Sequence, residues 1–124
     1  MSDRQITIAI DAMGGENSPY KVLKGAEIFL KNIHNLKIIF FGDESEINSV
    51  IEKEKLILNN FEIYHCSENV LDEDSASTIL RSRKNSSIYK GLEYVKNNSN
   101  SGFVSAGNTA AIMILSRLQI GMIE

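Results

Sequence analysis

Short apolar runs alternate with amphipathic stretches along the whole chain, and this pattern predicts alternating strands and helices. The runs at 5–11, 36–43, 61–66 and 103–106 are short and rich in β-branched or aromatic residues, as is typical of strands. Between them apolar residues recur at helical spacing, and the stretch 107–124 predicts a further apolar helix. The apolar helical positions are Val22, Ala26, Phe29, Leu30 and Ile33, then Ile47, Val50 and Ile51, then Ile88, Leu92 and Val95.

Helix starts are marked by residues that cap exposed backbone amides. The expected caps are Ser18 with Pro19 in the first turn, Asp43 paired with Glu46 as a capping box, and either Asn85 or Ser86. The polar, acidic stretch 67–77 is interpreted as a connection between the third strand and the third helix.

The alternation predicts an α/β fold with a mainly parallel sheet, helices on both faces and right-handed crossovers. In such a sheet every loop that follows a strand lies along one edge. Ligands bind on that edge, in the crevice where the strand order reverses. We therefore expect the loops that follow the first and fourth strands to matter most for function.

Composition and charge narrow the possible functions. The chain has 124 residues, 43% hydrophobic and 23% charged, which suits one ordinary globular domain. A net charge of −3 gives no cationic excess, so we expect no nucleic-acid partner. The single Cys66 favours a reducing cytoplasm, and no apolar stretch approaches the roughly 20 residues that cross a bilayer.

Two glycine-bearing loops, "DAMGGENSP" (11–19) and "SAGNT" (105–109), each connect a strand to a helix. Bare backbone amides at a helix start suit an anion, so the pattern predicts phosphate or carboxylate binding. Neither the NTPase phosphate loop nor the dinucleotide glycine fingerprint is present. The structural alternative is that the glycines only form a turn and that Asn108 or Thr109 only caps a helix.

Histidine and cysteine positions do not predict a metal site. His34 and His65 have no partner at metal-ligand spacing, and Cys66 is the single cysteine. Adjacent residues of a strand point to opposite faces, so His65 and Cys66 are not expected to form a catalytic pair.

Several motifs in order resemble one enzyme family. "IAIDAMGGENSP" and "FVSAGNTAAIM" are similar to two signatures of the PlsX phosphate acyltransferases, and "FFGDESEI", "IYHCSENV" and "ILRSRKNSSIYKGLEYVK" follow the family's pattern between them. The chain departs from that pattern at Glu16, at Ser75–Ala76 and at Ala110. The resemblance spans essentially the whole chain.

The resemblance implies a three-layer, Rossmann-like α/β fold related to isocitrate and isopropylmalate dehydrogenases. It implies transfer of a fatty acyl group from acyl carrier protein to inorganic phosphate, giving an acyl phosphate for phospholipid synthesis, without a cofactor. It also implies a cytoplasmic homodimer that associates peripherally with the inner face of the membrane. Family chains are substantially longer, so we expect 1–124 to be an N-terminal α/β segment that lacks the C-terminal half and is inactive alone.

For this reaction we assign phosphate binding to Gly14, Gly15, Ser105, Gly107 and Thr109, and a catalytic role to Asn108. Asp11 has two possible roles. It is either a base that accepts a proton from phosphate or a carboxylate that bonds the amides of its own loop.

The segment "RSRKNSS" adds cations, of which Arg81 and Lys84 are candidates to bind phosphate or the acidic carrier protein, while Arg83 is expected in solvent. The alternative for these cations is a solvated face that neutralises Asp72, Glu73 and Asp74.

Two other functions stay open. One is a phosphotransacetylase that uses short-chain acyl coenzyme A. The other is a non-catalytic module that binds an anion or dimerises.

Overall fold

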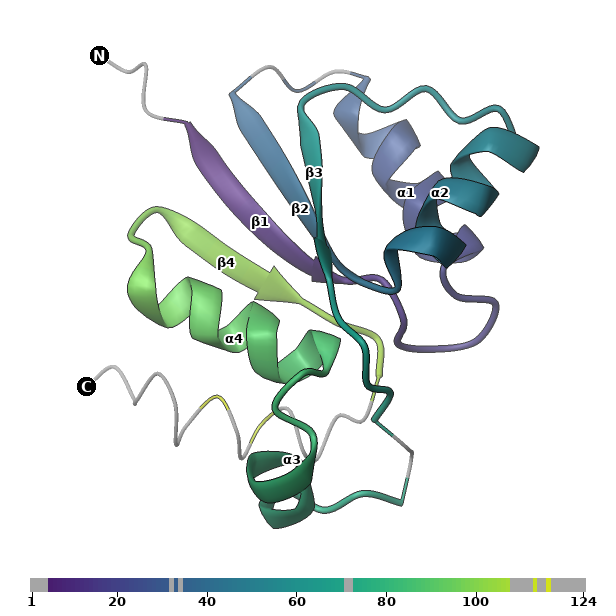
Figure 1. Ribbon diagram of the computed structural model, residues 1–124. Helices are drawn as coiled ribbons and strands as arrows, with labels where there is room; N and C mark the ends of the chain where they lie inside the picture. Colours follow the sequence, from purple (N-terminus) through teal and green to yellow (C-terminus); the bar gives the residue numbers. More distant parts are fainter. Residues whose placement is uncertain are drawn as a thin grey trace.

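The computed structural model describes residues 5–31, 33, 35–70, 73–107, 113 and 116. Strands and helices alternate through this part of the chain, as the sequence pattern predicts (Figure 1). The strands are β1 (Ile6–Asp11), β2 (Leu36–Gly42), β3 (Phe61–His65) and β4 (Ser101–Val104), and the helices are α1 (Tyr20–Leu30), α2 (Glu44–Lys53), α3 (Ala76–Ser82) and α4 (Ser87–Asn97).

The described strands form one sheet in the order β3-β2-β1-β4, and every pairing is parallel. The chain proceeds from β1 through β2 to β3 and then returns to place β4 on the other side of β1. The direction of strand order therefore reverses between β1 and β4. In open parallel sheets this switch point is where the loops at the carboxyl ends of the strands diverge and leave a crevice.

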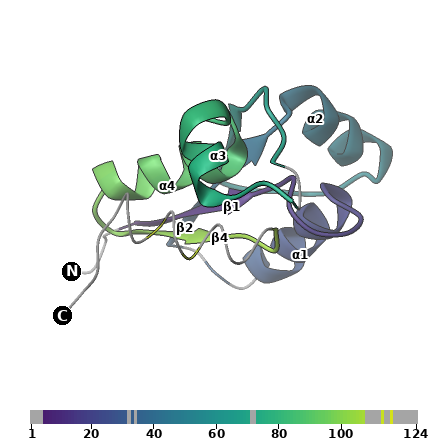
Figure 2. The same ribbon diagram turned by 90° about the horizontal axis from the view of Figure 1, so that it is seen from below.

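Helices cover both faces of the sheet because successive residues of a buried strand point to opposite sides. On one face, Ile38 and Phe40 of β2 pack with Leu23 of α1 and Ile47 of α2. On the other face, Ile39 and Phe41 belong to a cluster that contacts Tyr94 and Val95 of α4. Figure 2 shows α1 and α4 on opposite sides of the strands.

The caps at the starts of α2 and α4 are confirmed. Asp43 Oδ1 accepts the Glu46 amide at 3.0 Å at the start of α2. Of the two candidates for α4, Ser86 is the cap, and its hydroxyl accepts the Tyr89 amide at 3.2 Å.

The expected cap of α1 is wrong. Pro19 holds the cap position, with no side-chain cap bond, and the Ser18 hydroxyl donates instead to the carbonyl of Gly14. The apolar face predicted for this helix is also partly wrong, because Leu23 is buried while Phe29 is 55% exposed.

The sequence prediction missed one helix, α3, and misplaced the start of one strand, β4. Helix α3 begins at Ala76, inside the stretch interpreted as a connection, because Ser75 caps it by accepting the Thr78 amide at 3.2 Å. Strand β4 begins two residues earlier than 103, because its pairing with β1 starts at Ser101 opposite Thr7. The helix predicted for 107–124 lies almost entirely outside the described residues.

Candidate functional site

The loops that follow β1 and β4 lie side by side, at the edge of the sheet that the sequence predicts for both. Since β1 and β4 are neighbours in the sheet, their carboxyl ends deliver both loops to one place. The hydroxyl of Ser105, just beyond β4, donates to Asp11 Oδ2, at the end of β1, over 2.7 Å. The tertiary fold thus joins residues 94 positions apart.

The paired glycines make this close approach possible. A Cβ added at Gly14 would lie 2.7 Å from Asp11 Oδ2 and 2.8 Å from the Gly107 amide nitrogen, so no side chain fits there. Gly15 adopts a φ of +86°, which L side chains rarely adopt, and a Cβ added there would lie 3.1 Å from the Ala106 Cβ. The two glycines are therefore needed for the contact between the loops.

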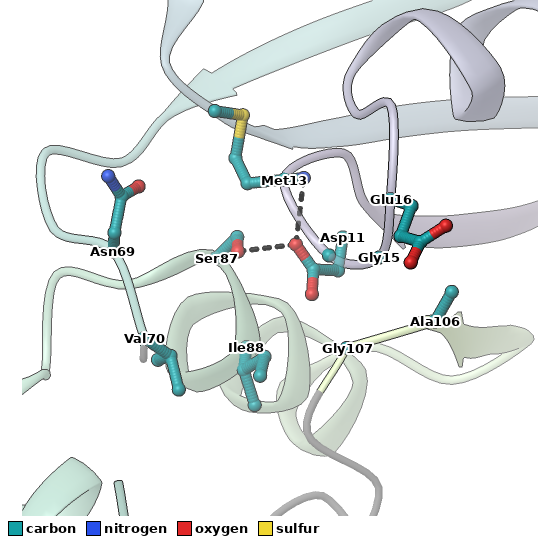
Figure 3. A pocket seen from close by; sticks show the side chains of 11 residues that line it. Asp11, Met13, Gly15, Glu16, Asn69, Val70, Ser87, Ile88, Ala106 and Gly107 are labelled. Carbon is teal, nitrogen blue, oxygen red and sulfur yellow. Dashed lines mark hydrogen bonds between the residues drawn. The ribbon is translucent and has the colours of Figure 1, made fainter. Parts of the chain in front are cut away.

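Asp11 is the centre of the hydrogen-bond network at this contact. Its side chain is buried, with 2% exposure, although it is a carboxylate. Oδ1 accepts the Met13 amide at 3.0 Å and the Ser87 hydroxyl at 2.5 Å (Figure 3). Oδ2 accepts the Ser105 hydroxyl at 2.7 Å. Three donors compensate the burial of its charge. The bond from Met13 is the one expected if Asp11 organises its own loop.

Ser87 was not predicted as a site residue. It is the first residue of α4, 6% exposed, and its hydroxyl links the start of that helix to the end of β1. The sequence indicates a helix start at this point, but only the return of α4 across the sheet brings it to Asp11.

A polar pocket of about 450 Å³ opens beside this network. Figure 3 shows that β1, its glycine loop, the segment after β3, the start of α4 and the loop after β4 all contribute to its walls. The lining residues are Asp11, Met13, Gly14, Gly15, Glu16, Asn69, Val70, Ser87, Ile88, Ala106 and Gly107.

The pocket combines backbone donors with acidic side chains. The Gly107 amide already donates to Ser105 Oγ at 3.0 Å. In the described part of the chain, no hydrogen bond involves the amides of Gly14 and Gly15. The described lining holds the carboxylates of Asp11 and Glu16 but no lysine or arginine.

The predicted cations do not line this pocket. Arg81 Nε donates to the Ser77 carbonyl of its own helix at 3.3 Å, and both Arg81 and Lys84 are exposed. The expectation that Arg83 lies in solvent is wrong, because its Nε forms an ion pair with Asp74 Oδ2 at 3.1 Å. That pair agrees with the alternative in which the segment neutralises its acidic neighbours.

Asn108 and Thr109, predicted as catalytic and phosphate-binding residues, lie outside the described residues, as does His34. Within the described chain, His65 and Cys66 make local contacts. His65 Nδ1 accepts the Glu44 amide at 3.1 Å at the start of α2, and Cys66 Sγ donates to the Tyr64 carbonyl. Burial, and next the charge of Asp11, raise the pKa of the Cys66 thiol to about 12.

The described residues contain neither a metal-binding cluster nor a membrane-spanning helix. Among them, no group of three or more His, Cys, Asp or Glu side chains is placed to hold a metal ion. No described helix is long and apolar enough to span a membrane.

Together, the parallel sheet and the pocket at its switch point define an α/β protein with a small polar pocket lined largely by strand-end loops. Residues 6–124 match the family model described as fatty acid synthesis protein. The chain therefore belongs to this family, and its resemblance to the PlsX phosphate acyltransferases is confirmed.

Curated relatives match almost the whole chain. This chain is 42% identical over 123 residues to the phosphate acyltransferase of Wolbachia pipientis subsp. Culex pipiens (strain wPip). The match covers 96% of this chain and 36% of that relative. It is 38% identical over 117 residues to the phosphate acyltransferase of Caldicellulosiruptor bescii, and the match covers 94% of this chain and 35% of that relative. This chain is 38% identical over 119 residues to the phosphate acyltransferase of Ehrlichia ruminantium (strain Gardel). The match covers 94% of this chain and 35% of that relative. The chain spans about a third of the length of these relatives.

Proposed function

We propose that this chain supplies the phosphate-binding part of an acyltransferase that moves a fatty acyl group from acyl carrier protein to inorganic phosphate. The single observation that supports this most strongly is the polar pocket at the β1–β4 switch point, in a chain whose curated relatives are named phosphate acyltransferases. The complete fold is proposed to be three-layered and Rossmann-like, related to the isocitrate and isopropylmalate dehydrogenases. The complete protein is proposed to be a cytoplasmic homodimer that associates peripherally with the membrane.

The reaction needs little covalent chemistry from the protein. A thioester is already activated, so a phosphate oxygen attacks the carbonyl carbon, a C–O bond forms, and the C–S bond breaks. The proton of the attacking phosphate ends on the departing sulfur. The protein has to position the phosphate and stabilise the oxyanion that develops on the carbonyl oxygen. The backbone of Gly14 and Gly15, next to that of Gly107, supports this positioning role.

Asp11 is proposed to be a positioning residue in this reaction. Its two oxygens accept three hydrogen bonds from three segments of the fold, which fixes the pocket wall. If Asp11 only positions, Asp11→Asn in a chain extended through the family's full length lowers kcat but leaves the pH dependence of the remaining activity unchanged. Loss of the acidic limb of the pH profile, in which a catalytic base becomes protonated, would show that Asp11 acts as the base.

Asn108 is proposed to bind phosphate beside Gly107, with Thr109 assisting, because they directly follow a lining residue of the pocket. Asn108→Ala is expected to raise the KM for phosphate sharply in the extended chain. Phosphate kinetics that stay the same would contradict that role.

Arg81 and Lys84 are proposed to contact the acidic carrier protein, since both are exposed and lie outside the pocket lining. Arg81→Glu should weaken carrier-protein affinity, and Lys53→Glu on α2 is the matched control. Equal affinities of the two variants would contradict the docking role.

The decisive experiment offers the extended chain both a fatty acyl carrier protein thioester and a short-chain acyl coenzyme A, and traps acyl phosphate with hydroxylamine. Hydroxamate formed from the carrier-protein thioester supports the proposal. Product from the coenzyme A thioester alone would favour a phosphotransacetylase, and phosphate binding without product would favour a non-catalytic anion-binding module. The 124-residue chain alone is expected to form no acyl phosphate.

A further inference from the structure

One wall of the pocket can only accept hydrogen bonds. As a carboxylate, Asp11 has no hydrogen to donate, and three of its roughly four acceptor sites are occupied. Ser87 gives its hydroxyl hydrogen to Asp11 Oδ1 at 2.5 Å, so its oxygen keeps only lone pairs for a ligand. Both residues line the pocket, and we call this pair the acceptor wall.

The remaining lining does not offset this wall with positive side chains. Glu16 adds a second carboxylate, and the described lining residues include no lysine or arginine. The donors in the described lining are the backbone amides of Gly14 and Gly15, close to Asp11 in the same loop, and the side-chain amide of Asn69. A ligand that contacts both sets of groups must therefore accept hydrogen bonds from these amides and donate at least one to the acceptor wall.

From this arrangement we infer that the pocket selects an oxyanion that keeps an O–H group, namely hydrogen phosphate, and rejects a fully deprotonated oxyanion such as sulfate. This rests on the proposed function, which makes inorganic phosphate a substrate. The O–H of hydrogen phosphate donates to the acceptor wall, and its charged oxygens accept from the glycine loop. Sulfate has the same tetrahedral shape but places lone pairs against the lone pairs of Asp11 and Ser87, which is repulsive.

The test is calorimetric titration of the 124-residue chain with inorganic phosphate and, separately, with sulfate, near neutral pH in a buffer that contains neither ion. One hydrogen bond to a charged group, set against one repulsive contact, predicts that phosphate binds about tenfold to a hundredfold more tightly than sulfate. This ratio of dissociation constants is the measured quantity, and it does not require turnover.

Variants of the acceptor wall should change this ratio in a defined direction. Ser87→Ala removes one acceptor and should lower the phosphate preference several-fold. Asp11→Asn replaces an acceptor with an amide donor and should bring the ratio to about one or reverse it. Ser86→Ala is the matched control, because Ser86 is equally buried and caps the same helix but does not line the pocket. It should lower the melting temperature and leave the ratio unchanged.

The outcomes separate this inference from the proposed function. Equal affinity for phosphate and sulfate in the unmodified chain overturns the acceptor-wall selection and leaves phosphate as the proposed substrate. A preference that persists unchanged in Ser87→Ala also overturns it, even if Asp11→Asn does not fold. Failure of the chain to bind either ion overturns the assignment of this pocket to phosphate, while acyl phosphate formation by the extended chain still tests the reaction.

Discussion

Gly14 is the residue at which the loops after β1 and β4 approach each other most closely. The Gly107 backbone and the Asp11 carboxylate both lie within 3 Å of where a Cβ would stand. Ordinary contacts of a Cβ atom are longer than that, so any side chain here must push the two loops apart. The position therefore links the stability of the fold to the shape of the pocket.

We expect Gly14→Ala to destabilise the chain by about 1–3 kcal/mol, because the neighbouring atoms are backbone and a buried carboxylate that cannot turn away. Urea unfolding measures this change. Gly25→Ala is the matched control, since nothing lies within 4 Å of its added Cβ and the residue is inside α1. It should stabilise the chain by about 0.5–1 kcal/mol. Destabilisation by both substitutions alike would contradict the close-contact explanation.

Cys66 is a second residue whose surroundings set its chemistry. It is buried in a cluster with residues of β1 and β2, against which α4 packs, and its thiol pKa is raised to about 12 by burial and by Asp11. At pH 8 a thiol with that pKa is ionised at about one part in 10⁴, and the thiolate is the reactive form.

The folded chain should therefore react with a disulfide reagent at pH 8 orders of magnitude more slowly than the same chain in concentrated urea, where the thiol pKa returns to about 8.5. Absorbance assays of the disulfide reagent, with and without urea, give the reaction rates of Cys66 in the two conditions. Similar rates in both conditions would mean that Cys66 is accessible in the native state.

At the scale of elements, Glu27 connects α1 to the segment that follows α2. Although a glutamate, it is 8% exposed, and its carboxylate accepts the Ile57 amide at 2.8 Å and the Lys24 ammonium at 2.7 Å. The Ile57 amide, and next Lys24, lower the pKa of the Glu27 carboxyl below its usual value. Because the folded pKa is the lower one, the stabilisation is present above the unfolded pKa and is lost as pH falls through the folded pKa.

Glu27→Gln should lower the melting temperature at pH 7, and the difference from the unmodified chain should disappear as the pH falls through the acidic range in which Glu27 becomes protonated. Thermal unfolding followed by circular dichroism at several pH values measures this. Glu52→Gln, on the exposed side of α2, should have no such pH-dependent effect. A constant difference across the whole pH range would show that the charge of Glu27 is not involved.

At the scale of the whole molecule, the face of the sheet next to α1 carries an apolar groove of about 430 Å³. Phe29 and Val104 line it and are 55% and 53% exposed, and Asp11 and Ala106 line both this groove and the polar pocket. Contiguous exposed apolar surface of this kind binds apolar probes.

We expect the folded chain to enhance the fluorescence of anilinonaphthalene sulfonate, and Phe29→Gln to reduce that enhancement. Ile57→Gln serves as the control, because Ile57 is 73% exposed but lies outside the groove. Enhancement that falls equally in both variants would indicate unspecific binding to exposed side chains. The absence of enhancement in the unmodified chain would show that the groove is closed in solution.

Apart from α3, which was not predicted, the order of elements and most of their limits could be read from the sequence, because they depend on local spacing and capping. The short apolar run of β2 and the Asp43 and Ser86 caps each specify structure within a few residues. The prediction was wrong where a side chain formed a different local hydrogen bond from the one expected. Ser18 bonds to Gly14 rather than capping α1, and Ser75 starts a helix inside a polar stretch.

The sequence by itself determined that this is a parallel α/β protein with glycine loops after two strands, since both features follow from short-range pattern. Only the tertiary structure decided that these loops meet at the side of β1 where the strand order reverses, that Ser87 reaches Asp11, and that Arg81 stays away from the pocket. The physical reason is distance along the chain. Asp11 is 76 residues from Ser87 and 94 from Ser105, and contacts over such separations form only when the whole sheet and α4 pack together.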